Sequence, residues 1–153
     1  MKIATITLAA LIAAGSAFAA DKPKFAGAEY LSSEATLKAK LPFSEAVRVG
    51  NTLYLSGVVG TVPGTRDIVP GGIEAETRQV LETIRGVLER NHSSLDNVVK
   101  CTVMLADMSE WSKMNGVYTT FFAKHFPARS AMGVNGLALG AKVEIECIAT
   151  VGE

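Results

Sequence analysis

The sequence lacks the residues on which several common classes of active site depend. It has only two cysteines, Cys101 and Cys147, with no C-x-x-C pair, and only two histidines, His92 and His125. So few cysteines exclude a disulfide-rich scaffold, and without H-E-x-x-H a zinc site supplied by the protein is not expected. No G-x-S-x-G, Walker or G-x-G-x-x-G motif occurs. We therefore expect no metal, no cofactor and no covalent nucleophile of these kinds.

An excess of charge of either sign is also missing. Fifteen basic and 15 acidic residues give a formal net charge of zero. A nucleic-acid binder driven by bulk charge usually carries a clear basic excess, so no nucleic-acid partner is expected. The length of 153 residues fits one domain.

The first residues have the pattern of an export signal. A positive Met1-Lys2 start precedes an apolar run, and Ala17-Phe18-Ala19 is a small-x-small cleavage pattern. The run is too short for a bilayer span, which needs ~20 residues, although a retained anchor is the alternative. We expect a signal peptide at 1–19, an extended arm at 20–42 and one domain at 43–153. The mature protein would be periplasmic or secreted, with no membrane span.

The hydrophobic periodicity predicts two helices among five strands, in the order ββαβαββ. Gly50-Asn51 joins the first two strands and suits a type II′ turn. Ser109 is the expected N-cap of the second helix. The expected strands are 46–49, 52–56, 98–106, 128–134 and 142–151, the expected helices 73–91 and 109–124, and the expected loop 57–72. This order implies an α+β fold, a mixed sheet with both helices on one face.

Alternation along the strands assigns side chains to the two faces of the sheet. The face under the helices is expected to take Val47, Val49, Leu53, Leu55, Val99, Cys101, Val103, Leu105, Ile145 and Cys147. The opposite face takes Arg48, Tyr54, Ser56, Lys100, Met104, Glu144 and Ile148. This second face is neither polar nor apolar throughout, so it is either a subunit contact or a solvated surface. Buried thiols are the favoured state of the cysteines, with a cross-strand disulfide as the alternative.

Aromatic residues recur at helical spacing in the second predicted helix. They are Trp111, Tyr118, Phe121 and Phe122, with Met114 between them. Such a stripe is typical of core packing rather than of a binding site.

Two charged residues stand where chemistry is possible. Arg129 begins a strand directly after a helix, and arginine suits bidentate capture of a carboxylate. A surface arginine is the default interpretation of such a position. Glu144 lies inside a strand, where carboxylates are depleted. It either pairs with Lys100 or Lys142, which the pattern alone favours, or holds a water or a proton.

Several ordered motifs between Pro42 and Val151 resemble the Rid family of RidA/YjgF-like imine and enamine deaminases. They are Pro42-Phe43-Ser44, the stretch 46–57, Pro70-Gly71-Gly72-Ile73-Glu74, Thr77-Arg78-Gln79-Val80-Leu81, Val98-Val99-Lys100, Asn115-Gly116-Val117-Tyr118, Phe126-Pro127-Ala128-Arg129-Ser130 and Val143-Glu144-Ile145-Glu146. The resemblance implies a chorismate-mutase-like fold and a homotrimer with clefts between subunits. It also implies hydrolysis of small 2-imino or enamine acids to 2-keto acids and ammonia, without metal or cofactor.

The resemblance also implies a site for a small carboxylate substrate. Arg129 would bind its carboxylate and Glu144 would orient water or move a proton. The cleft would be lined by Phe43, Ser56, Gly57, Asn115 and Ala131, the last through its backbone N–H.

Three positions depart from the pattern of many family deaminases. Phe43 stands where they have tyrosine, Val58 where they often have glutamine, and Ala131 where they often have cysteine. An apolar Phe43 and Val58 favour an altered substrate range, slow turnover or binding alone, although Phe43 could instead be a core anchor. The alternatives are therefore a non-catalytic trimeric module that binds carboxylates or protects proteins, or a related hydrolysis or lyase step.

Overall fold

The computed structural model describes residues 27–151, and the expected signal peptide at 1–19 lies outside them. The strands are β1 (Glu29–Leu31), β2 (Ala46–Val49), β3 (Thr52–Leu55), β4 (Val58–Val59), β5 (Val98–Leu105), β6 (Ala128–Gly133) and β7 (Val143–Thr150). The α-helices are α1 (Glu34–Lys38), α2 (Gly72–Arg90) and α3 (Trp111–Tyr118). Short 3-10 turns occupy Leu95–Asn97, Met108–Glu110, Thr119–Phe121 and Ala138–Gly140.

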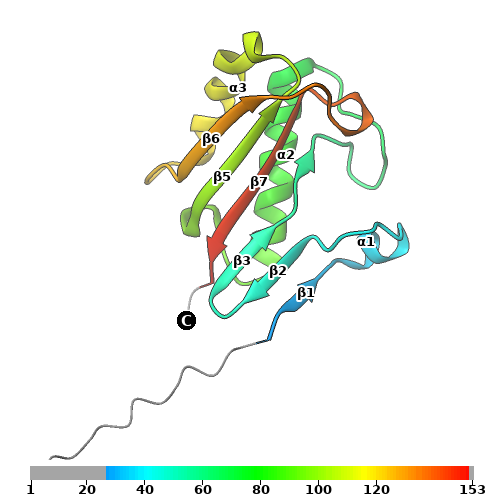
Figure 1. Cartoon of the computed structure of the whole chain (residues 1–153), viewed down its shortest axis with the longest axis vertical. Helices are drawn as coiled ribbons and strands as arrows, with labels where there is room; N and C mark the ends of the chain where they lie inside the picture. The colour runs from blue at the N-terminus through cyan, green and yellow to red at the C-terminus, as the bar shows by residue number, and fades with distance from the viewer. Residues whose placement is uncertain (1–26, 152–153) are drawn as a thin grey trace, which may run out of the picture.

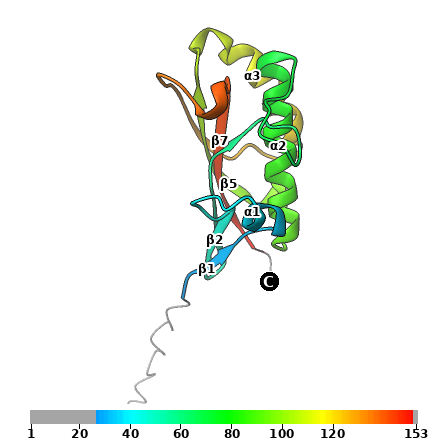
Figure 2. The ribbon, with the colours of Figure 1, turned by 90° about the vertical axis from the view of Figure 1, so that its right-hand side faces the viewer.

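The strands form one mixed sheet, ordered β1-β2-β3-β7-β5-β6, with β4 also paired to β7 (Figure 1). β5 pairs in parallel with β6 and antiparallel with β7. Helices α2 and α3 pack on the same face, and the other face carries no helix in the described residues (Figure 2). The predicted α+β class and the order of the main elements are confirmed.

Helix α2 forms the centre of the hydrophobic layer. Its apolar side chains recur every three or four residues, so they share one face of the helix. Ile73, Val80, Leu81, Ile84 and Leu88 are buried there against the sheet. Glu74 in the first turn and Arg90 in the last turn complement the helix dipole.

The β2–β3 hairpin is confirmed, but the faces assigned to β2 are wrong. Gly50 has a φ of 59°, as the first residue of a type II′ turn requires. The two-residue turn pairs Val47 with Tyr54 and Arg48 with Leu53. Because paired residues share a face, Val47 lies with Tyr54 on the helix-free face, hereafter the outer face. Buried Ala46 therefore supplies the β2 contact with the core.

The face predicted for Val99 is also wrong. The β5–β7 register shifts between Val98 and Lys100. This irregularity inserts a residue, so Val98 turns to the core and Val99 is 49% exposed. Beyond it the alternation is as predicted, with Cys101, Val103 and Leu105 buried.

Two segments expected to be irregular contain regular structure. The 20–42 arm includes β1, which pairs with β2, and the single helical turn of α1. The 57–72 loop includes β4 and an isolated bridge between Thr61 and Ile68. Both are short pieces stabilised by tertiary pairing, which local periodicity does not reveal.

Glu45 joins the first of these segments to the domain. Its carboxylate accepts hydrogen bonds from Ser33 Oγ at 2.7 Å, Thr36 Oγ1 at 2.6 Å and Arg90 Nη2 at 3.0 Å. Burial opposes the charge, but these three partners outweigh it and lower the pKa of the Glu45 carboxyl. Glu45 thereby fixes the position of the chain just before β2.

The second predicted helix is shorter and starts differently. Ser109 is not its N-cap: Asp107 caps the 3-10 turn Met108–Glu110 by accepting the Ser109 N–H at 2.8 Å, and α3 then begins after Glu110, whose side chain makes no capping hydrogen bond. The α-helix ends at Tyr118 and a 3-10 turn carries the chain to Phe121. Of the aromatic stripe, Tyr118, Phe121 and Phe122 are buried, whereas Trp111 is 39% exposed.

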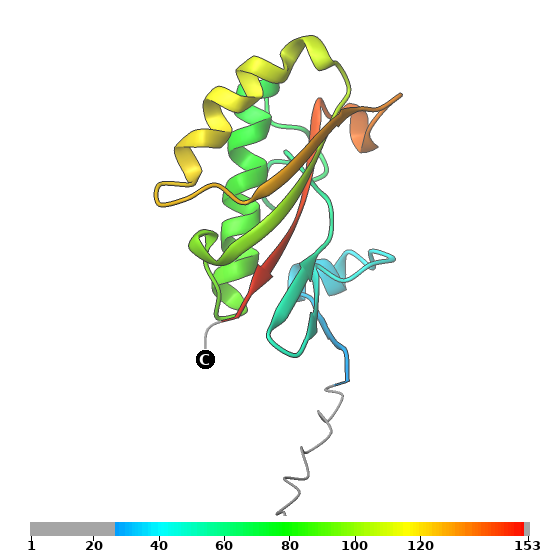
Figure 3. The same cartoon turned by 60° about the vertical axis from the view of Figure 1, so that its left-hand side comes forward.

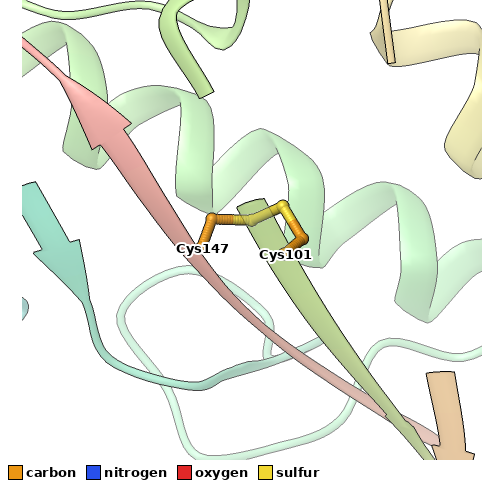
Figure 4. Close-up of a disulfide and its surroundings, with 2 residues drawn as sticks. All are labelled: Cys101 and Cys147. Atoms are coloured by element: carbon orange, nitrogen blue, oxygen red, sulfur yellow. A yellow bond between two sulfur atoms is a disulfide. The ribbon is translucent and has the colours of Figure 1, made fainter. Parts of the chain in front are cut away.

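The two cysteines form a disulfide, contrary to the thiols we favoured. Cys101 on β5 and Cys147 on β7 are directly opposite in the ladder, with a Cα–Cα distance of 4.1 Å (Figure 4). Both are buried on the side of the helices, as the alternation predicted. The disulfide links two central strands that are 46 residues apart in sequence.

Candidate functional site

Arg129 lies on β6, the open edge of the sheet (Figure 3). It is paired with Cys101, so its side chain is on the helix side. There its guanidinium lies over the ring of Tyr118 on α3, with 4.6 Å between Cζ and the ring centroid. This cation–π contact fixes the plane of the guanidinium and leaves its N–H groups directed along that plane.

A pocket lies between α3 and the start of β6. Its lining consists of Asn115, Tyr118, Thr119, Phe126, Pro127 and Arg129. Within the described residues, Asn115 Oδ1 and Tyr118 Oη are buried without a hydrogen-bond partner. Buried polar atoms are rarely left unpaired, so two of them beside one arginine indicate a place prepared for a ligand or for another chain.

The backbone of β6 offers hydrogen-bond donors along the open edge of the sheet. The Val134 N–H donates to the Leu105 carbonyl at 2.9 Å. In a parallel ladder alternate residues direct both backbone groups to the same neighbour. The N–H groups of Arg129 and Ala131 therefore point away from β5, to the open edge. The proposed role of the Ala131 N–H has the necessary geometry.

The tyrosine in this pocket is a neutral group. Burial raises the pKa of the Tyr118 hydroxyl to about 12, an effect that the nearby Arg129 charge only partly offsets. The pocket therefore combines one fixed positive charge with a neutral hydroxyl. We name Arg129, Asn115, Tyr118 and the Ala131 amide the arginine group.

Glu144 lies elsewhere, on β7. It is paired with Met104 and so is on the outer face. Its carboxylate leans over Gly57, where an added Cβ would overlap Oε1. Only glycine leaves room for that position of the carboxylate. The predicted pairing with a lysine is wrong within the described residues, since Lys142 Nζ instead bonds Glu110 at 2.8 Å and Lys100 Nζ bonds Ser130 at 3.0 Å.

Ser56 directly precedes Gly57 and contacts the segment that holds Phe43. Ser56 Oγ donates to the Ser44 carbonyl at 2.7 Å, which ties the Phe43-Ser44 segment to the end of β3. Phe43 is 51% exposed, so it is not a core anchor. Val58, by contrast, pairs with Ile145 and packs against the core, so it does not make the outer face more apolar. We name Glu144, Gly57, Ser56 and Phe43 the glutamate group.

The two groups do not meet within one chain. Arg129 on β6 is in register with Cys101 on β5 and Cys147 on β7. Glu144 lies on β7, two strands from β6 in the sheet and three residues before Cys147 in the sequence. Their side chains leave opposite faces of the sheet. The predicted site residues thus form two separate half-sites. Sequence reasoning missed Tyr118 as a site residue, because a tyrosine in an aromatic stripe looks like core; its spacing of three from Asn115 was the available signal.

In the described part of the chain, residues 27–151, no cluster of three or more potential metal ligands occurs. Among those residues there is also no helix with the length and apolar character needed to cross a membrane.

Comparisons with known proteins show the family of the chain. A family model described as "Endoribonuclease L-PSP" matches residues 33–151. The "2-iminobutanoate/2-iminopropanoate deaminase" of Mus musculus is 43% identical over 111 residues, covering 72% of this chain and 82% of the relative. A "RutC family protein" of Pyrococcus horikoshii is 44% identical over 108 residues, covering 71% and 86%. A Yersinia pestis crystal structure, titled as a protein of unknown function of the conserved Rid protein family, has a TM-score of 0.76 at 36% identity, covering 82% and 100%.

Proposed function

The chain belongs to the Rid family, described as endoribonuclease L-PSP, and on that premise we propose that it hydrolyses small 2-imino acids to 2-keto acids and ammonia. Relatives that are 43% and 44% identical to this chain bear the name 2-iminobutanoate/2-iminopropanoate deaminase. The observation that carries the proposal is the arginine group, in which the Arg129 guanidinium, held over the Tyr118 ring, lines a pocket beside the open edge of β6.

Binding follows from the charges of such a substrate. The carboxylate of a 2-imino acid accepts hydrogen bonds, which the Arg129 guanidinium and the Ala131 N–H supply. A charge-assisted contact of this kind contributes about 1.5–3 kcal/mol. The apolar rings of Phe126 and Pro127 line the same pocket and suit a short aliphatic side chain.

The reaction needs little covalent help from the protein. Water adds to the carbon of the protonated imine and gives one proton to Glu144, so a neutral carbinolamine forms. Glu144 returns that proton to the amine nitrogen. The C–N bond then breaks as the hydroxyl oxygen becomes the carbonyl, and the hydroxyl proton passes to the released ammonia, which gives the keto acid and ammonium. Positioning and acid–base help of this kind, worth ~10²–10⁴-fold, are sufficient for an electrophile that is already activated.

We propose further that the site forms between copies in a homotrimer. Two features support this: the half-sites lie on opposite faces of the sheet, and the outer face carries half-exposed Tyr54 and Met132. A neighbouring chain seated on the outer face would bring its β6 edge, and with it Arg129, to Glu144. Such a head-to-tail contact repeats until a ring closes.

Export to the periplasm or outside the cell is also a proposal. It is supported by the pattern at residues 1–19 and by the disulfide, because structural disulfides persist mainly in oxidising compartments.

A non-catalytic carboxylate-binding module is the second candidate. Phe43 favours it, because an exposed phenylalanine brings no hydroxyl to the chemistry. Val58 no longer supports it, since its side chain faces the core.

The deciding experiment generates 2-iminobutanoate with an amino-acid oxidase in the presence of semicarbazide. Wild-type protein should suppress semicarbazone formation, whereas Arg129→Ala and Glu144→Gln should not. Arg78→Ala, on the exposed face of α2, is the matched control and should behave as wild type. If wild-type protein leaves semicarbazone formation unchanged while binding 2-keto acids, the binding module replaces the deaminase.

A further inference from the structure

Tyr118 is a buried residue whose ring contacts the Arg129 guanidinium. It is 2% exposed, and its hydroxyl has no hydrogen-bond partner among the described residues. A buried tyrosine hydroxyl normally has a hydrogen-bond partner, because otherwise its desolvation costs free energy with no compensating hydrogen bond. The missing partner is therefore not among residues 27–151.

The surroundings of the ring explain why it is held so firmly. Phe122 packs against it with 4.8 Å between ring centroids, and the Arg129 guanidinium covers it at 4.6 Å. Ring and guanidinium are thus fixed relative to one another. The hydroxyl stays protonated at all physiological pH values, so it is a permanent donor beside a permanent positive charge.

We propose that Tyr118 is a further substrate-contacting residue, whose hydroxyl donates a hydrogen bond to the same carboxylate that Arg129 binds. This inference rests on the proposed function, since it assumes a carboxylate substrate. The ring orients the guanidinium, and the hydroxyl adds a second donor from a residue that lines the same pocket. An acceptor-only group such as a carboxylate matches both donors.

Two substitutions distinguish the role of the Tyr118 hydroxyl from that of its ring. Tyr118→Phe removes only Oη, and Tyr118→Leu also removes the surface beneath Arg129. Tyr30→Phe is the matched control, because Tyr30 is 74% exposed on β1, outside both half-sites. For each variant we would measure the Kd for 2-oxobutanoate by calorimetry, kcat and KM for imine hydrolysis, and the melting temperature.

Tyr118→Phe should weaken 2-oxobutanoate binding about tenfold and raise KM about tenfold, with kcat changed less than threefold. Its melting temperature should not fall, because the hydroxyl has no partner to lose. Tyr118→Leu should lower kcat as well, and Tyr30→Phe should change nothing.

An unchanged Kd and KM in Tyr118→Phe would overturn the proposal. So would a fall in melting temperature that accompanies equal losses with every ligand, because that pattern indicates a structural hydroxyl. A wild-type protein that binds 2-oxobutanoate but hydrolyses no imine would refute the deaminase alone, and the Kd comparison would still decide the role of Tyr118. A wild-type protein that neither binds nor hydrolyses would overturn both.

Discussion

The arginine group and the glutamate group are built in different ways. Arg129 is held within its own chain, by the Tyr118 ring and by the β6 strand that carries it. The Glu144 carboxylate has no hydrogen bond or ion pair among the described residues and leans over the backbone of Gly57. The arginine side chain is thus held by a neighbour in its own chain, whereas the glutamate side chain is not. The proposed function assigns binding to the arginine group and proton transfer to the glutamate group.

Loss of the disulfide beside the arginine group should have the largest effect, on the free energy of unfolding. Arg129 is in register with the Cys101–Cys147 disulfide, so the pair stabilises the part of the sheet that positions it. Replacing both cysteines with alanine should lower the free energy of unfolding by about 2–4 kcal/mol, measured by urea denaturation. Reductant should then have no effect on the variant. Equal stability of wild type and variant would show that the disulfide contributes nothing in solution.

Arg129 itself comes next. Arg129→Ala should lower kcat/KM for 2-iminobutanoate about a hundredfold, since it removes a charge-assisted contact with the carboxylate. The loss should appear mainly as a higher KM, with Arg78→Ala unchanged in steady-state kinetics. A loss confined to kcat would move Arg129 from binding to chemistry and blur the division between the half-sites.

Gly57 tests the glutamate group without touching a charge. Gly57→Ala should displace the Glu144 carboxylate, because the new Cβ would overlap Oε1. We expect kcat to fall about tenfold with KM nearly unchanged. Gly27→Ala, where a Cβ meets nothing within 4 Å, is the control. If KM rose while kcat stayed constant, Glu144 would be a binding residue instead.

Glu45 should give the smallest effect. Its carboxylate binds Ser33 and Thr36, in the segment that precedes Phe43 and Ser44. It therefore helps to position one part of the glutamate group. Glu45→Gln should cost about 1 kcal/mol at pH 7, because the half-exposed Arg90 partner is partly screened. A lowered pKa means that this stability is full above the ordinary value of 4.5 and is lost as pH falls through the folded value. Urea denaturation of both proteins should therefore show their difference shrinking in acid; a constant difference would contradict it.

The long helices and strands could be predicted from the sequence. The features that depend on how strands pair could not. Helix α2 and strands β5 and β7 carry strong periodicity, so their positions and most of their faces were correct. The faces of β2 were readable from the two-residue turn, which requires Val47 to oppose Tyr54. The shift beside Val99 and the strand at 29–31 depend on contacts with distant residues, which local patterns do not encode.

The site followed the same division. The motifs placed Arg129 on β6 and Glu144 on β7, but they did not show that these side chains leave opposite faces of the sheet. The state of the cysteines depended on Cys101 and Cys147 being directly opposite, a matter of register rather than composition. Tyr118 was hidden because burial and binding use the same aromatic residue.

The most direct test of the shared site mixes two inactive variants. Arg129→Ala keeps the glutamate group and Glu144→Gln keeps the arginine group, so a head-to-tail trimer that contains both chains rebuilds intact sites. Random co-assembly after co-expression should restore about a quarter of wild-type imine hydrolysis. Arg129→Ala co-expressed with the double variant is the control and should stay inactive. No recovery in the mixture, from trimers that contain both chains, would contradict a site shared between two copies.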